Sequence, residues 1–121
     1  MLQGKSEAVR HAEVYRSSFA ISVCPSENVE SPTIVGAQAA NELLNIIGIK
    51  ASFVLTEYND KIYISSRSID EINVQIIMEK LGGGGHLNVA GAQLTGVTIV
   101  QAKRMIQDTL DEMLKEGDIE E

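Results

Sequence analysis

Four consecutive glycines followed by a histidine are the residues of this 121-residue sequence that are best suited to bind a small molecule. They are Gly82, Gly83, Gly84 and Gly85, with His86 directly after them. Glycine loses more backbone entropy on folding than any other residue, so a run of four indicates positive φ angles or a close approach to the backbone. A ligand is the more informative explanation. The alternative is a helix cap at Gly82 followed by an ordinary loop.

The chemistry that this glycine run (residues 82–85) offers is the binding of a small anion. Consecutive N–H groups can form an anion-binding nest, and an imidazole can donate a hydrogen bond to phosphate. The run follows an expected helix, whereas the glycines of a P-loop or a Rossmann turn precede one. Because the C-terminal end of a helix is electronegative, phosphate binding here would depend on the backbone amides and on His86.

Arg67 is a second candidate for contact with an anion. It lies between an expected strand and an expected helix, where a guanidinium and backbone amides can share one ligand. The alternative is a surface arginine that pairs with Asp70 or Glu71. A helix of about twelve residues would separate Arg67 from the glycine run by ~18 Å. Arg67 therefore either touches another part of the same ligand or is structural.

The positions of the reactive side chains do not favour a hydrolytic metal centre or a nucleophilic cysteine. His11, His86 and Cys24 are far apart, and no His-x-His, Asp-x-Asp or His-Glu-x-x-His motif is present. A nucleophilic pair of Cys24 and His86 is disfavoured, because a strand cysteine is usually a small buried hydrophobe. We expect no catalytic residue, no metal ligand and no cofactor in this chain.

Composition indicates a single globular domain. The net charge of −7 argues against binding of long nucleic acid, whose affinity comes mainly from Lys and Arg contacts to phosphates. The single cysteine excludes an internal disulfide and fits a reducing compartment. No stretch approaches the ~20 apolar residues that span a bilayer, and the first residues do not form a signal peptide. We expect a cytoplasmic domain with no direct membrane contact.

Hydrophobic periodicity predicts an α/β fold, a mixed sheet of about four to five strands flanked by helices. The expected elements are a short helix over 5–16, strands over 19–24, 51–58, 61–66 and 90–96, and helices that begin at Ser31, Ser68 and Thr98. The first of these three helices is expected to run to Gly48, and the second leads into the glycine run.

Three local patterns support these boundaries. The Asn-Asp pair at 59–60 favours a tight hairpin. Ser68 with Glu71 and Thr98 with Gln101 each match a capping box at a helix start.

The motifs together resemble a known family. Residues 83–91, Gly-Gly-Gly-His-Leu-Asn-Val-Ala-Gly, resemble the Gly-Gly-Gly-His-x-x-Ala-Ala-Gly signature of the DHH-associated C-terminal domain in the DHH phosphoesterase superfamily. Residues 65–68, Ser-Ser-Arg-Ser, match its second characteristic block. The similarity covers about residues 19–114, and residues 72–86 look most like the membrane-anchored cyclic-di-AMP phosphodiesterases of Gram-positive bacteria. Val89 departs from the family's alanine and could reshape the floor of the pocket.

The resemblance implies a division of labour between two domains. A preceding domain with the Asp-His-His motif would hold two manganese ions that activate water against a phosphodiester. Residues 1–18 would be a linker or leading helix from that absent half, residues 19–116 the substrate-binding DHH-associated domain and residues 117–121 an acidic tail. The fragment alone would hydrolyse nothing, and the parent protein would be anchored in the cell membrane.

The resemblance also implies the substrate and its contacts. The substrate would be cyclic-di-AMP, hydrolysed to linear pApA, and it would touch the glycine run, His86, Asn88, Arg67 and Ser68. A short-oligonucleotide exonuclease or adenosine bisphosphate phosphatase of the same superfamily remains an alternative. A nucleic-acid-binding appendage, like the related domain of alanyl-tRNA synthetases, is another. A homodimer of the parent stays open.

Overall fold

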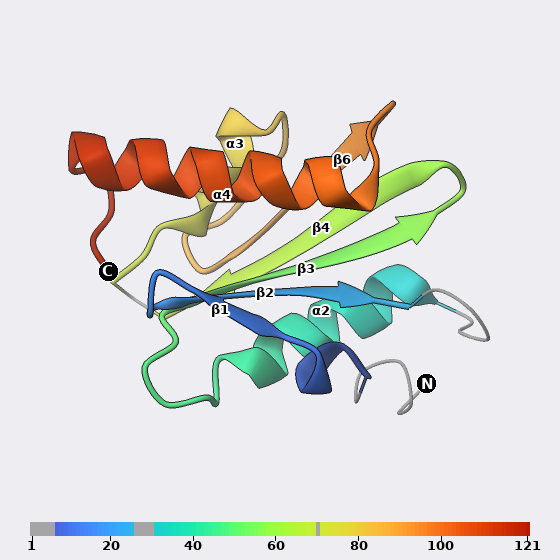
Figure 1. Cartoon of the computed structure of the whole chain (residues 1–121), viewed down its shortest axis with the longest axis horizontal. Coiled ribbons are helices and arrows are strands. Elements are labelled where there is room, and N and C mark those ends of the chain that lie inside the picture. The colour runs from blue at the N-terminus through green and yellow to red at the C-terminus, as the bar shows by residue number, and fades with distance from the viewer. Residues whose placement is uncertain (1–6, 26–30, 70) are drawn as a thin grey trace.

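The computed structural model describes residues 7–25, 31–69 and 71–121 of the chain. These residues form a six-stranded sheet with helices on both faces (Figure 1). The strands are β1 (Glu13–Tyr15), β2 (Phe19–Cys24), β3 (Ala51–Tyr58), β4 (Lys61–Ser68), β5 (Gly84–Gly85) and β6 (Val89–Thr95). The helices are α2 (Pro32–Leu43), α3 (Val74–Lys80) and α4 (Ile99–Glu116), and residues 7–10 are also helical.

The strand order across the sheet is β1-β2-β3-β4-β6-β5. Strands β2 and β3 are parallel, with α2 in the crossover between them, and the other neighbouring strands are antiparallel. The mixed sheet confirms the expected α/β fold. It has six strands rather than four to five, because β1 lies in the expected leading helix and β5 in the expected glycine loop.

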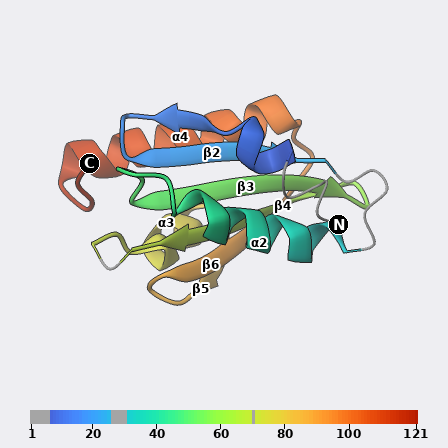
Figure 2. The same cartoon turned by 90° about the horizontal axis from the view of Figure 1, so that it is seen from below.

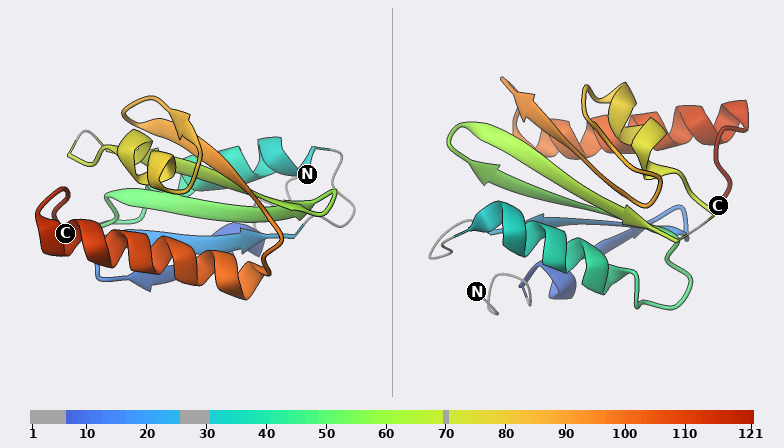
Figure 3. Two further views of the ribbon diagram at one scale, coloured as in Figure 1. Left: turned by 90° about the horizontal axis from the view of Figure 1, so that it is seen from above. Right: turned by 180° about the vertical axis from the view of Figure 1, so that it is seen from behind.

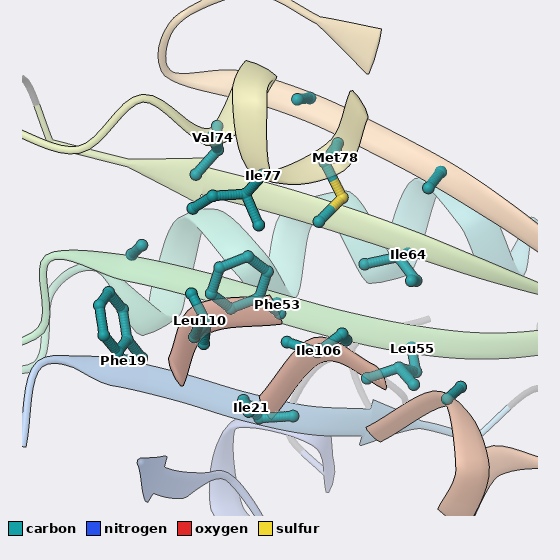
Figure 4. Close-up of a cluster of buried hydrophobic side chains, with 14 of the residues drawn as sticks. Phe19, Ile21, Phe53, Leu55, Ile64, Val74, Ile77, Met78, Ile106 and Leu110 are labelled. Atoms are coloured by element: carbon teal, nitrogen blue, oxygen red, sulfur yellow. The ribbon is translucent and has the colours of Figure 1, made fainter. Parts of the chain in front are cut away.

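One face of the sheet is covered by α3 and α4. The buried side chains there include Phe53 from β3, Ile77 and Met78 from α3, and Ile106 and Leu110 from α4 (Figure 4). Helix α4 begins with the expected capping box: the Thr98 hydroxyl accepts the Gln101 N–H at 3.1 Å, and the Gln101 side chain accepts the Thr98 N–H at 2.8 Å.

The other face is covered only in part, by α2 and by the helical residues 7–10. Val35, Ala39 and Leu43 of α2 pack in a second apolar cluster with Ala20 and Val54 of the sheet. Figure 2 shows α2 lying along β3 and β4, with β6 and β5 to one side of it. The β5–β6 hairpin forms the edge of the sheet opposite β1 and lies beside α3 (Figure 3). One side of this hairpin is therefore left without a helix over it.

Two expected helices have different bounds in the structure. Helix α2 ends at Leu43, and the apolar residues that were expected to continue it are exposed, Ile46 in part and Ile47 completely. The third helix begins at Val74, not at Ser68, because Asn73 is its N-cap and accepts the N–H groups of two residues in the first turn. Ser68 is the last residue of β4.

The N-terminal segment is not one helix over 5–16. Residues 7–10 are helical, and β1 follows and pairs antiparallel with β2. The hydroxyl of Tyr15 donates to the Asp111 carboxylate of α4 at 2.7 and 2.9 Å, and the Arg16 Nε donates to the same carboxylate at 2.7 Å. These contacts fasten β1 to the rest of the domain. Residues 1–6 lie outside the described part.

Two further expectations concern short segments. Asn59 and Asp60 have φ angles of 53° and 62°, which confirms the tight hairpin between β3 and β4. The acidic tail, residues 117–121, packs in part against the domain, because Ile119 is 6% exposed and belongs to the larger apolar cluster.

Candidate functional site

The glycine run is part helix cap and part strand. Gly82 has a φ of 86° and ends α3, and its N–H donates to the Glu79 carbonyl at 3.1 Å. The Gly83 N–H donates to the Met78 carbonyl at 2.8 Å. The next two glycines form β5, which pairs with β6. The helix cap considered from the sequence is therefore present, and the residues after it form a hairpin.

Two of the glycines, Gly83 before β5 and Gly85 in it, are required by close contact with β6. A Cβ on Gly83 would lie 2.1 Å from the Gly91 carbonyl oxygen, and one on Gly85 would lie 2.5 Å from the Val89 oxygen. Gly85 also has a φ of 146°. A Cβ on Gly84 would meet no heavy atom within 4 Å. Neither packing nor a positive φ angle therefore requires glycine at position 84, unlike at the other three positions of the run.

The four amides do not form the anion-binding nest that the sequence suggested. The first two donate to carbonyls of α3. His86 and Val89 exchange backbone hydrogen bonds of 2.7 and 3.3 Å. Hydrogen-bonded and non-hydrogen-bonded pairs alternate along two antiparallel strands, so Gly84 and Gly91 are the next hydrogen-bonded pair. The N–H of Gly85 then points away from β6 at the sheet edge. A phosphate on this hairpin would therefore be held mainly by side chains.

The sheet register brings Arg67 and His86 into one row. Arg67 of β4 is paired with Val89 of β6, and Val89 is opposite His86. Residues directly opposite each other in a sheet point to the same face. Two strand spacings, ~10 Å, separate the backbones of Arg67 and His86. From the sequence, Arg67 and the glycine run were expected to be ~18 Å apart, because a helix of about twelve residues was predicted between them. The helix between them, α3, has only 7 residues.

A second and a third row lie further along the same strands. Ser65 is paired with Gly91, which is paired with Gly84, and Tyr63 is paired with Gln93. We call this side of β4, β6 and β5 the open face; its residues are Tyr63, Ser65, Arg67, Gly84, His86, Val89, Gly91 and Gln93. A pocket of about 530 Å³ lies on it, lined by Thr33 of α2, Tyr63, Ile64, Ser65, Gly82, Gly83, Gly91, Ala92 and Gln93.

Arg67 is a partly buried cation without a carboxylate partner in the described part of the chain. Its Nη1 donates to the Ser66 carbonyl at 2.8 Å, and burial lowers the pKa of the guanidinium. Glu71, one of the two acids considered as its partner, pairs instead with Lys50 at 3.1 Å. Asp70, the other, lies outside the described residues. A desolvated and unpaired guanidinium is well suited to bind phosphate.

His86 is exposed, and its ring makes no hydrogen bond to any residue that the structure describes. Asn88, two residues later, is engaged in the fold. Its Nδ2 donates to the Ser68 hydroxyl and to the Ile69 carbonyl, both at 3.0 Å. The buried Ser68 hydroxyl in turn donates to the Ile72 carbonyl at 2.6 Å. Asn88 and Ser68 thus hold the hairpin turn, and with it His86, against the end of β4.

Sequence reasoning missed Ser65, Tyr63 and Gln93, which share the open face with Arg67. The strand over 61–66 was recognised, and alternation along it would have placed every second residue on the same face as Arg67. The pairing with Gln93 had no local signal, because it depends on which strand lies beside β4.

No group of three His, Cys, Asp or Glu side chains that could hold a metal ion occurs among residues 7–25, 31–69 and 71–121. Cys24 is buried in β2, and burial raises the pKa of its thiol, which disfavours a nucleophilic role. None of the helices in the described ranges is long and apolar enough to cross a membrane.

The mixed sheet, with α3 and α4 on one face and α2 on the other, is the fold of a known domain family. Residues 17–116 match the model of the DHHA1 domain, and the chain belongs to this family.

Among its relatives, the chain is 45% identical over 108 residues to the cyclic-di-AMP phosphodiesterase PdeA of Listeria monocytogenes, a match that covers 88% of this chain and 16% of PdeA. It is 36% identical over 115 residues to the cyclic-di-AMP phosphodiesterase GdpP of Bacillus subtilis, covering 93% of this chain and 18% of GdpP. The chain thus spans less than a fifth of either relative.

A solved structure has the same fold. An exopolyphosphatase-related protein from Bacteroides fragilis superposes with a TM-score of 0.79 at 23% sequence identity, covering 93% of this chain and 34% of that protein.

Proposed function

We propose that this chain is the substrate-binding domain of a cyclic-di-AMP phosphodiesterase, which hydrolyses the cyclic dinucleotide to linear pApA and is inactive without its DHH half. The similarity to PdeA and GdpP along most of the chain supports the substrate class. The observation that carries the proposal is the row formed by Arg67 and His86, two phosphate-binding side chains with no acidic partner in the described part of the chain.

The residues of this row and those next to it have distinct roles. The His86 ring donates a hydrogen bond to a phosphate oxygen near the scissile bond, and Arg67 binds phosphate from the other side of β6. Gly84 and Gly91, in the neighbouring row, let the ligand lie directly on the backbone. Asn88 positions His86 through its hydrogen bonds to the end of β4. The value of these contacts is orientation and charge stabilisation.

The metal chemistry lies outside this chain in the proposal. The described residues do not fit a metal site. Two manganese ions are proposed for the DHH half, which would supply activated water. The parent protein is proposed to be anchored in the cell membrane through other segments, with this domain in the cytoplasm.

Comparing the chain with the parent protein tests the proposal directly. The 121-residue chain should bind cyclic-di-AMP weakly and release no pApA, whereas the parent should convert cyclic-di-AMP to pApA with added manganese. Product analysis by chromatography would show both results. Turnover by the isolated chain, or a parent inactive on cyclic-di-AMP, would contradict the proposal.

The parent's preference between cyclic and linear substrates distinguishes a cyclic-di-AMP phosphodiesterase from the other enzymes of the superfamily. A short-oligonucleotide exonuclease or adenosine bisphosphate phosphatase would act faster on linear pApA or on the bisphosphate than on the cyclic compound. The nucleic-acid-binding appendage is disfavoured by the net charge of −7. A gel shift with tRNA at low salt would nevertheless support it.

A further inference from the structure

We propose that the pocket on the open face binds one adenine base of the ligand, with Gln93 as the residue that selects it and Tyr63 as its stacking partner. This inference rests on the proposed function and adds a specificity-determining site to it. The pocket lies beyond the phosphate-binding row, and neither residue belongs to the motifs that characterise the family.

The two side chains are available for a ligand. Gln93 is exposed and Tyr63 is partly exposed, and neither makes a side-chain hydrogen bond to another residue within the described ranges. They are directly opposite each other on β6 and β4 and line the same pocket. Side by side, the amide of Gln93 can hydrogen-bond to the edge of a base, and the ring of Tyr63 can stack on the face of the base.

The chemistry of Gln93 favours adenine over guanine. Its Nε2 can donate to N7 of adenine while its Oε1 accepts from the exocyclic N6 amino group. Guanine presents two acceptors, N7 and O6, at the same edge, which suits arginine instead. The Tyr63 ring can stack on either base, because every base has a π-face. Gln93 would therefore set the choice of base, whereas Tyr63 would add affinity without selectivity.

The floor of the pocket allows a flat ring to approach. Gly91 and Gly83 line it without side chains, and Gly91 cannot gain one easily, since a Cβ there would lie 2.8 Å from the Ile64 carbonyl oxygen. The volume of about 530 Å³ is in the range of small-molecule sites.

The spacing of the rows indicates a ligand longer than one nucleotide. Tyr63 lies four residues before Arg67 on β4, which corresponds to about 13 Å along the strand. The row of Ser65, Gly91 and Gly84 lies between them. A phosphate at the Arg67 row and a base at the Gln93 row therefore fit a dinucleotide better than a mononucleotide.

A change of base preference in Gln93→Arg would test the inference. The probes are pApA and pGpG, titrated into the 121-residue chain and followed by amide chemical shifts in NMR spectra. The wild-type chain should bind pApA more tightly than pGpG. Gln93→Arg should shift the ratio of the two dissociation constants by about tenfold or more towards pGpG, because arginine contacts guanine through O6 and N7.

Three further variants separate the effects of charge, of the amide and of the aromatic ring. Gln107→Arg adds the same charge on α4, over the opposite face of the sheet, and should leave the ratio unchanged. Gln93→Leu removes the amide without adding charge and should bring the two dissociation constants together. Tyr63→Ala should weaken both probes equally.

The outcomes separate this inference from the proposed function. If pApA binds and His86→Ala weakens it, but neither Gln93 variant alters the ratio, the adenine pocket is wrong and the proposed function stands. If neither probe perturbs the open face of the wild-type chain, both fail.

Discussion

The side of the sheet that α2 partly covers has two regions, the packed region under α2 and the open face. They differ in whether their polar side chains are hydrogen-bonded within the chain. Under α2, the Ser52 hydroxyl donates to the Ala40 carbonyl at 2.6 Å, among buried aliphatic side chains. On the open face, Ser65, Tyr63 and Gln93 make no side-chain hydrogen bond to residues within the described ranges. The hydrogen bond of Ser52 to α2 stabilises the fold, whereas the polar groups of the open face that make no such bond remain available to a ligand.

The comparison predicts that variants of the open face impair binding and turnover with little loss of stability, whereas variants in packed regions do the reverse.

The largest effect is expected for His86→Ala in the parent protein. Loss of a donor that stabilises developing charge typically lowers kcat about 100- to 1,000-fold, and we expect a similar fall in kcat/KM for cyclic-di-AMP. Stability should hardly change, because the ring is exposed. Steady-state kinetics and thermal unfolding measure the two quantities.

His11→Ala is the matched control for this variant. His11 lies 3.1 Å from the Glu7 carboxylate on an exposed segment away from the open face, so its removal should leave turnover unchanged. Equal losses in both histidine variants, or none in either, would remove His86 from the site.

The next effect separates two adjacent glycines. Gly83→Ala should lower the free energy of unfolding by about 1 to 3 kcal/mol, because its Cβ would overlap the backbone of β6. Gly84→Ala should change it by less than about 1 kcal/mol, since its Cβ meets no atom within 4 Å, yet it should weaken binding of cyclic-di-AMP. Denaturant unfolding and a binding titration on both variants test this. If Gly84→Ala binds like the wild type, the ligand does not lie on the glycine row.

A smaller effect is expected for two serines on neighbouring strands. Ser52→Ala should cost about 1 kcal/mol of stability, because it removes a buried hydrogen bond to α2. Ser65→Ala should stay within about 0.5 kcal/mol of the wild type, because the half-buried Ser65 hydroxyl makes no hydrogen bond within the described ranges, but should weaken dinucleotide binding. The same unfolding and binding measurements apply. A large loss of stability for Ser65→Ala would show that the open face is structural after all.

Several parts of the molecule could be predicted from the sequence because their signals are local. The capping box at Thr98 and the turn at 59–60 depend on a few adjacent residues, and both are confirmed. The glycine and histidine motif identified the family. The nest of glycine amides was wrong, because the sequence does not show that Gly82 and Gly83 donate back to α3.

The parts that sequence reasoning missed depend on contacts between distant segments. The length of the third helix was overestimated because Ser68 resembles a cap, whereas its hydroxyl is held by Ile72 and Asn73 caps the helix. That error placed Arg67 too far from His86. The register of β4 against β6 brings them together, and a single sequence carries no signal for register between strands that are not joined by a turn.

The smallest effect concerns a second arginine, at the opposite edge of the sheet. Arg16 is paired with Asp111, unlike Arg67, and the Tyr15 hydroxyl donates to the same carboxylate. The hydrogen bond from Tyr15, with a further contribution from Arg16, lowers the pKa of Asp111, whereas burial and this hydrogen bond raise the pKa of Tyr15. A lowered carboxyl pKa gives stability that is present above its unfolded value, about 4, and is lost as pH falls through the folded value.

Tyr15→Phe should therefore destabilise the chain at pH 7 by less than about 1 kcal/mol, because the contact is accessible to solvent. The difference from the wild type should shrink below about pH 4, where Asp111 becomes protonated in both proteins. It should also shrink above about pH 10, where the raised tyrosine pKa no longer favours the folded state. Tyr58→Phe, at an exposed position, is the control and should show no pH-dependent difference. Unfolding curves at pH 3, 7 and 10.5 would measure this, and a pH-independent loss in Tyr15→Phe would mean that packing, not the bond to Asp111, holds β1.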